Sequence, residues 1–233
     1  MKLMDIKELK GKIILKSGLH IGAGDTEMKI GGTDNPVIKH PHTQEPYIPG
    51  SSLKGKIRSL LEIRTGLMVK TGGQPLSFKH LNGLEGQEKT DCENILKIFG
   101  ANGSDADDTM TFGPGRASFA DCPLDEVWKK RAMEAHLPLT EVKSENSIDR
   151  IQGTASRGGP RFTERVPSGT EFTFSISIKK LDAAENLEDI LLTGVKLLEM
   201  DALGGSGSRG YGHITFLFDD PELQEKFDSI TPF

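Results

Sequence analysis

Large apolar residues alternate with polar or smaller residues in several parts of the chain, which is the period of a half-buried β-strand. This alternation is clearest in residues 172–178 and 214–218. Residues 9–21 mix β-branched residues with lysines and meet a glycine turn, so they predict a first strand that ends near His20. A further strand is predicted over 115–122.

Two other segments repeat with the period of a helix. The first opens at Gly50-Ser51-Ser52, where a serine side chain can cap a helix, and apolar residues then follow at 53, 57, 60 and 61. The second is predicted from Leu187 to Leu203, with one apolar side. A short helical fragment is expected near Cys92 to Phe99.

The order of strand, helix, strands, strand, helix and strand predicts an α+β fold of the ferredoxin-like (RRM-like) type, in a single domain over 1–233. Glycine-punctuated residues 66–113 are expected to form an insertion or lid, with a mobile tip at 101–108. Residues 140–170 include a polar stretch rich in glycine and arginine, so we expect a projecting arm or thumb there. The charged tail after the last strand is expected to fray.

Composition narrows the class of protein. The hydrophobic fraction is 35%, and no apolar run approaches the roughly 20 residues that a membrane-spanning helix needs. The charged first residues do not resemble a secretory signal, so we expect a soluble, cytoplasmic protein that does not bind membranes. The two cysteines, Cys92 and Cys122, have no metal-ligand spacing and are expected to be reduced thiols.

Charge is distributed unevenly along the chain. The formal net charge is −5, yet residues 1–70 hold 12 Lys and Arg against 7 Asp and Glu. The remaining residues are therefore acidic overall. A basic region on an acidic protein is suited to binding one polyanion on one face while other faces contact proteins. The uneven charge does not by itself identify a nucleic-acid-binding protein, so the motifs have to decide.

The predicted helix at 50–61 carries basic residues. Lys54 and Arg58 lie four residues apart and so share one helical face, close to the exposed amides of the helix start. Together these groups would form a phosphate clamp. A lone basic helix is more often an ordinary solvated face, and it is the neighbouring motifs that favour the clamp.

A glycine cluster, LGGSGSRGYG, occupies residues 203–212 and holds five glycines. Glycine lets backbone N–H groups approach an anion closely, and Arg209 adds positive charge. The cluster is not a Walker A loop, because no Gly-Lys-Ser/Thr follows. A flexible turn is the plain alternative, but a turn rarely needs so many glycines, so we predict backbone contact with RNA.

Asp34 lies in the segment GGTDNPVIKHP, in a loop shaped by glycines and Pro36. One carboxylate cannot hold a magnesium ion tightly, so RNA would have to complete any metal site. On local chemistry alone, an aspartate that shapes a turn is the more probable interpretation. His20 could contact RNA or assist proton transfer, and the other histidines have no metal-ligand spacing.

Four motifs together resemble the RAMP proteins of CRISPR systems, and specifically the repeated backbone subunit of the type III-A (Csm) complex. The motifs, which follow one another along nearly the whole chain, are HIGAGD at 20–25, GGTDNPVIKHPHTQEPYIPGSSLKGKIRSLLE at 31–62, ENSIDR at 145–150 and LGGSGSRGYGHI at 203–214.

The resemblance implies copies of the chain stacked along a CRISPR RNA, with the arm wedged into the duplex of guide and target. It also implies a single-strand-specific endoribonuclease that cuts guide-bound target RNA at regular intervals with Asp34, with a divalent metal, expected to be Mg²⁺. The implied partners are the CRISPR RNA, the target RNA and other Csm subunits, including the large polymerase-like subunit and the small subunit. The residues implied to contact RNA are His20, Ser51, Ser52, Lys54, Arg58, Gly204, Gly205, Ser206 and Gly207, and Arg209 is added as a candidate from the glycine cluster itself. Such contacts would grip the RNA backbone, because a guide of variable sequence cannot be bound through its bases.

Three other functions remain open at this point. The chain could be a non-catalytic RNA-binding scaffold of the same or a Cmr-like complex, in which Asp34 only shapes a loop. It could be a guide-processing endonuclease, for which His20 is the candidate base. An enzyme acting on a nucleotide or phosphometabolite would need further catalytic groups, and the sequence offers none that we recognise.

Overall fold

A computed structural model describes residues 2–24, 35–101, 112–156 and 160–233. Its main sheet has four antiparallel strands in the order β2-β5-β1-β6. The strands are β1 (Asp5–Leu15), β2 (Ala117–Phe119), β5 (Glu171–Lys180) and β6 (Ile214–Phe218). Taken in chain order, the second strand lies beside the third, the third beside the first and the first beside the fourth. With one helix after the first strand and one after the third, this is the ferredoxin-like arrangement, which confirms the predicted α+β class.

The alternation in the sequence sorts each strand into a buried and an exposed side. In β5, Phe172, Phe174, Ile176 and Ile178 are buried, whereas the residues between them are not. β1 pairs with β5 along its length and with β6 over Gly11–Leu15, so it lies in the centre of the sheet. Leu15, at the end of β1, is therefore held on both sides, and the segment that follows leaves the sheet at a fixed point.

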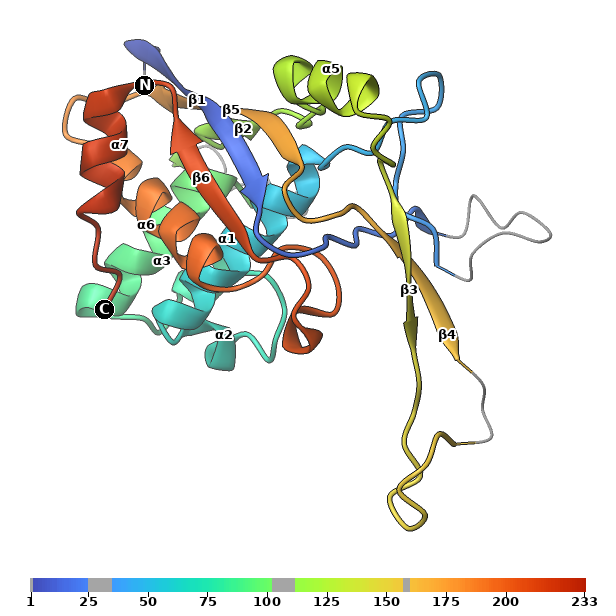
Figure 1. Ribbon diagram of the computed structural model, residues 1–233. Helices are drawn as coiled ribbons and strands as arrows, with labels where there is room; N and C mark the ends of the chain where they lie inside the picture. Colours follow the sequence, from blue (N-terminus) through green and yellow to red (C-terminus); the bar gives the residue numbers. More distant parts are fainter. Residues whose placement is uncertain (1, 25–34, 102–111, 157–159) are drawn as a thin grey trace.

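Helices cover one face of the sheet (Figure 1). The two long helices that pack on each other are α1 (Gly50–Arg64) and α6 (Leu187–Met200). Gly194 of α6 lets them approach closely, because a Cβ atom there would lie 2.7 Å from a methyl carbon of Ile57. The observed α6 ends three residues before Leu203, where the sequence predicted its end.

The insertion packs against the same helical layer rather than standing apart. It contains α2 (Leu67–Lys70), η2 (Phe78–Leu81) and α3 (Gly86–Phe99). The helix expected at 92–99 begins earlier, at Gly86, and its buried residues include Ile95 and Phe99. Residues 102–111, which hold most of the expected mobile tip, lie outside the described residues.

A second, two-stranded sheet forms an arm that projects away from the main sheet (Figure 1). It pairs β3 (Glu141–Glu145) with β4 (Arg161–Arg165) in antiparallel register. Beyond these strands, an isolated bridge joins Ile148 and Ala155, and the Asp149 carboxylate accepts hydrogen bonds from the next turn. The arm reaches well beyond the body that carries the core.

Outside the insertion, two of the described α-helices were not predicted from the sequence. α5 (Glu126–Glu134) begins at Asp125, whose carboxylate accepts a hydrogen bond from the Trp128 amide. α7 (Pro221–Asp228) occupies the tail that was expected to fray, so that expectation is wrong. Phe227 of α7 is fully buried and packs against Phe216 and Phe218, which explains why the tail is ordered.

No helix within the described ranges is long and apolar enough to cross a membrane. Cys92 and Cys122 are both buried free thiols, in agreement with the expected reduced state. Burial raises the pKa of Cys92 to about 11 and the pKa of Cys122 to about 12, so neither is a thiolate near neutral pH.

Candidate RNA-binding and cleavage site

The segment that follows β1 carries His20 and is anchored to the base of the arm. Leu19 and Val166 form a bridge with hydrogen bonds in both directions. His20 Nδ1 lies 2.7 Å from the carbonyl oxygen of Glu164. Because a carbonyl oxygen only accepts, Nδ1 must carry the proton, and Nε2 is the nitrogen left for RNA or for proton transfer.

The glycine cluster closes against this segment. The Gly205 amide donates to the His20 carbonyl oxygen at 2.9 Å, and the Gly212 amide donates to the Gly18 carbonyl oxygen at 3.0 Å. Gly204 has a φ of 75°, and a Cβ atom there would lie 2.4 Å from the His20 carbonyl oxygen. Only glycine fits this contact. The structure thus brings together His20, Gly204 and Gly205, which lie far apart in the sequence.

Ser206, Gly207 and Arg209 continue the same loop toward the arm. Ser206 has a φ of 65°, and a short 3₁₀ helix, η3 (Gly207–Arg209), follows it. Arg209 Nε lies 3.2 Å from a carboxylate oxygen of Glu145 in β3, and its guanidinium also donates to the Ser206 hydroxyl. More than half of the Arg209 side chain is exposed. Arg209 therefore remains open to an anion although it is tied to the arm.

The start of α1 presents the candidate residues Ser51 and Ser52. The sequence predicted that a serine caps this helix. In the structure the helix begins at Gly50 after Pro49, so both serines lie in its first turn instead. No acidic residue occupies this turn. The Gly50 amide donates to the Asp121 carboxylate at 2.8 Å, while Ser51 is exposed. The helix start keeps its positive character on the side of Ser51.

Lys54 and Arg58 have different environments although they share a helix face. Lys54 is partly exposed and pairs with none of the described residues. The Arg58 guanidinium instead donates to Glu62 at 2.8 Å, to the Gly100 carbonyl at 3.0 Å and to the Leu76 carbonyl. This geometry favours a structural role for Arg58 in holding the insertion on α1. Its predicted contact with RNA has no support from the structure.

Asp34 lies outside the described residues, which resume at Asn35. Asn35 is nevertheless fixed, because its carbonyl oxygen accepts a hydrogen bond from the Glu164 amide at 3.1 Å. The Glu164 carboxylate accepts from the Val37 amide at 2.9 Å and from Lys39 at 2.6 Å. Burial acts to raise the pKa of Glu164, but these hydrogen bonds outweigh it and the pKa is lowered. The chain that follows Asp34 is thus anchored to β4 by an ionised carboxylate.

Tyr211, like Glu164, is a residue that the sequence did not single out. It is fully buried, and its hydroxyl donates to the Glu145 carboxylate at 2.9 Å. Lys143 and Arg165 lie over its ring, at 4.5 and 5.0 Å from the centroid. Burial and the Glu145 carboxylate raise the pKa of Tyr211, so the hydroxyl keeps its proton. Tyr211 joins the glycine cluster to the arm.

The described residues contain no group of three or more His, Cys, Asp or Glu side chains arranged to hold a metal ion. Asp34, the expected metal-holding residue, lies outside the described ranges, so the divalent-metal site stays a prediction.

The antiparallel α+β body with a glycine-rich loop and a projecting arm is the arrangement that the resemblance to RAMP proteins implies, and comparisons with known proteins identify the same class. The family model of the RAMP superfamily matches residues 12–215. The crystal structure of the Csm3-Csm4 subcomplex in the type III-A CRISPR-Cas interference complex aligns with a TM-score of 0.56 and 26% identity, covering 99% of each chain.

Curated relatives are more similar in sequence. The CRISPR system Cms endoribonuclease Csm3 of Methanothermobacter thermautotrophicus is 39% identical, over 89% of this chain and 82% of that protein. The protein of the same name from Methanocaldococcus jannaschii is 42% identical, over 91% of this chain and 82% of that protein. The Streptococcus thermophilus protein is 38% identical, over 90% of this chain and 86% of that protein. The chain therefore belongs to the RAMP superfamily and, within it, to the Csm3 family.

Proposed function

We propose that this protein is the repeated backbone subunit of a type III-A CRISPR ribonucleoprotein, and that it cuts target RNA paired to the guide. The observation that carries the proposal is that His20 contacts the glycine cluster at the end of the sheet where α1 begins, with Lys56 of α1 paired to Asp201 at 2.7 Å just before the cluster. These groups offer backbone amides, hydroxyls and Lys54, which pairs with none of the residues that the structure describes, to a polyanion. The endoribonuclease activity is inferred from the name of the curated relatives, and the type III-A complex from the solved structure that this chain resembles.

Guide binding would rest on backbone contacts, so the protein holds the RNA by its shape and charge. Gly204, Gly205 and Gly207 allow close approach, Ser51 and Ser52 offer hydroxyls, and Lys54 and Arg209 supply charge. Pairing between guide and target then selects the sequence that is cut. Further copies of this chain, the large polymerase-like subunit and the small subunit complete the proposed complex, which works in the cytoplasm.

Cutting is assigned to Asp34, and the chemistry follows the resemblance described above. A 2′-hydroxyl of the target attacks the adjacent phosphorus, the bond to the 5′-oxygen breaks, and a cyclic phosphate and a 5′-hydroxyl result. A divalent cation, expected to be Mg²⁺, would stabilise charge on the phosphate. Asp34 would hold this cation or orient the 2′-hydroxyl. Glu164, through Asn35 and Val37, fixes the chain that leaves Asp34.

The test compares the assembled complex carrying wild-type chain, Asp34→Ala or Asp34→Asn on a labelled RNA complementary to the guide, with Mg²⁺ or with EDTA. We expect regularly spaced cuts by wild type in Mg²⁺, none in EDTA, and at least a hundredfold slower cutting by both variants with unchanged target binding, because loss of one catalytic acid–base or metal-holding group costs about 10²–10⁴ in rate. Asp219→Ala is the matched control: Asp219 is exposed, and the same removal there should leave cutting unchanged.

Other outcomes identify the alternatives. Guide and target binding without cutting by wild type would mean a scaffold subunit. Cutting of precursor repeats by the isolated chain, abolished by His20→Ala, would mean a guide-processing enzyme. Wild-type rates in Asp34→Ala would place the catalytic group elsewhere in the complex.

A further inference from the structure

A polar cavity lies where the arm meets the glycine cluster. Its volume is about 380 Å³, and the residues that line it are Glu145, Asn146, Ser147, Arg161 and Arg209. The first four belong to the arm, whose projection from the body is visible in Figure 1. Of the lining residues, only Arg209 has been considered so far as a contact for RNA.

The pairing of β3 with β4 explains why one arginine in this cavity is open. Glu145 and Arg161 are directly opposed across the two strands, a position in which opposite charges usually pair. Glu145 instead turns toward the glycine cluster, where its carboxylate accepts from the Tyr211 hydroxyl and pairs with Arg209. Arg161 is left exposed, with neither a hydrogen bond nor an ion pair to any residue that the structure describes.

The charges of the lining define the chemical class of the ligand. Two guanidinium groups face one carboxylate, so the cavity attracts an anion. A guanidinium presents its N–H groups as a planar fork that matches a phosphate. Asn146 and Ser147 add neutral donors and acceptors of the kind that bind ribose hydroxyls and base edges. The negative charge of Glu145, the one carboxylate in the lining, would repel a second phosphate group, so the cavity suits a single phosphate.

From this geometry we propose that the cavity is a subsite for one nucleotide of the bound RNA, with Arg161 holding its phosphate and Asn146 and Ser147 contacting its ribose or base. The inference rests on the proposed function, because it extends the path of the guide from the glycine cluster onto the arm. Glu145 is the positioning residue of the subsite: it keeps Arg209 at one side of the cavity, while Arg161 at the other side has no partner in the described part of the chain.

The test measures binding of the full chain to a fluorescein-labelled single-stranded RNA with the sequence of the guide, at several salt concentrations. Arg161→Gln should weaken binding about fivefold to tenfold at low salt, and should reduce the slope of log affinity against log salt by about 0.7, the value for one phosphate contact on single-stranded nucleic acid. Arg161→Lys should keep the slope, since it keeps the charge.

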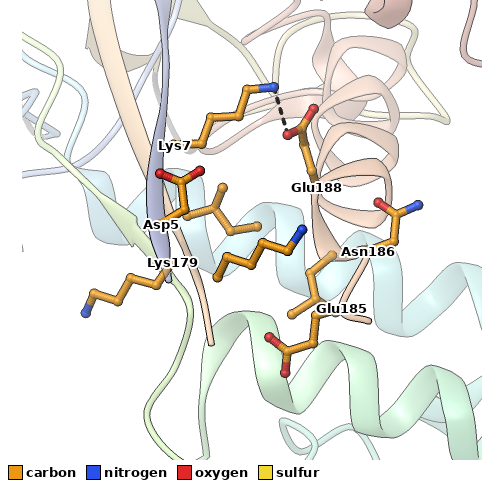
Figure 2. A pocket seen from close by; sticks show the side chains of 9 residues that line it. Asp5, Lys7, Lys179, Glu185, Asn186 and Glu188 are labelled. Carbon is orange, nitrogen blue, oxygen red and sulfur yellow. Dashed lines mark ion pairs between the residues drawn. The ribbon is translucent and has the colours of Figure 1, made fainter. Parts of the chain in front are cut away.

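Lys179→Gln is the matched control for net charge. Lys179 lines a different hollow, at the beginning of β1, which it shares with Asp5, Lys7 and Glu188 (Figure 2). Because Arg161 pairs with no described residue, the thermal unfolding midpoints of Arg161→Gln and wild type should agree, and this comparison separates a binding effect from misfolding.

Wild-type affinity and slope in Arg161→Gln, with weaker binding by Lys54→Gln, would overturn the subsite and leave the proposed function standing. Equal losses in Arg161→Gln and Lys179→Gln would also overturn it, because the effect would then be one of overall charge. If wild type itself showed no salt-dependent binding of RNA, either as the full chain or in the assembled complex, the proposed function would fail first.

Discussion

Helices α1 and α6 pack on each other but begin at opposite ends of the sheet, and their first turns carry different charges. The first turn of α6 contains Glu188 and Asp189, which pair with Lys7 and Lys226. Figure 2 shows the pair of Lys7 and Glu188 beside the hollow at that end. The first turn of α1 contains no acidic residue, and no side chain caps it from the N-cap position.

This difference separates a helix start that the protein neutralises within its own first turn from one where the Asp121 carboxylate binds the Gly50 amide from outside the helix. Acidic side chains in the first turn stabilise a helix by about 0.3–1 kcal/mol each, through the positive end of the helix dipole. At α6 the protein uses that stabilisation itself. At α1, Asp121 binds the Gly50 amide from outside the helix, and the side of Ser51 and Lys54 remains for an external anion. The comparison supports RNA at the α1 end and a structural role for the charges at the α6 end.

The largest expected effect concerns the charges at the α6 end. Glu185 precedes the helix and pairs with Arg116 at 2.7 Å, and Arg116 is 2% exposed. Glu185→Ala leaves a buried guanidinium without its counter-charge, so we expect the free energy of unfolding to fall by about 3 kcal/mol. Urea unfolding of the full chain measures this.

The control is Glu8→Ala, which removes the partner of Lys10 from an exposed pair. It should change stability by less than about 1 kcal/mol, as exposed ion pairs do. Equal stabilities of Glu185→Ala and wild type would show that internal charge pairing does not hold this end of the sheet, and would remove the contrast between the two helix starts.

The next prediction introduces into the first turn of α1 an acidic residue of the kind that the first turn of α6 already contains. Ser51→Asp places an acid in the exposed first turn of α1, so we expect stability to rise by about 0.5 kcal/mol. The same charge would repel a phosphate, so guide affinity should fall about tenfold, or about 1.4 kcal/mol. Ser51→Asn is the control of equal size. Unchanged RNA affinity in Ser51→Asp would mean that no phosphate lies at this helix start.

The strands and long helices could be predicted from the sequence because their signals are local. Alternation in 172–178 and the helical period after Leu187 depend on neighbouring residues only, and both elements are present. The helix α7 was missed although Asp220 and Pro221 form a local helix-start signal, because the charged composition of the tail indicated fraying. The packing of Phe227 on the aromatic rings of β6, which orders the tail, is visible only in the structure.

The residues of the candidate site also fall into those that a local motif marks and those that depend on distant partners. Glycines and a basic helix mark the glycine cluster and Lys54 in the sequence itself. The environment of Arg58 could not be predicted, because its carbonyl partners Leu76 and Gly100 lie in the insertion. Glu145 and Glu164 were also missed, since their partners Tyr211 and Lys39 are distant along the chain. Carboxylates that organise a site through long-range contacts leave no motif.

The smallest expected effect is the pH dependence of the stability that Glu188 contributes at the start of α6. Burial acts to raise the pKa of Glu188, but hydrogen bonds from Lys7 and Lys226 outweigh it, and the pKa is lowered. A carboxylate with a lowered pKa in the folded state stabilises the protein above its unfolded pKa, about 4.3 for glutamate, and this contribution is lost as the pH falls through the folded value. Glu188→Gln removes the contribution and its pH dependence together.

We therefore expect Glu188→Gln to be less stable than wild type by about 0.5–1 kcal/mol at pH 7, and the difference to shrink below about pH 5 and vanish in stronger acid. Urea unfolding between pH 3 and pH 7 measures it, with Glu222→Gln, an exposed acid in the first turn of α7, as the control. A difference independent of pH would mean that Glu188 acts through packing rather than charge. RNA affinity should not change in this variant, because its charge is already neutralised within the α6 end.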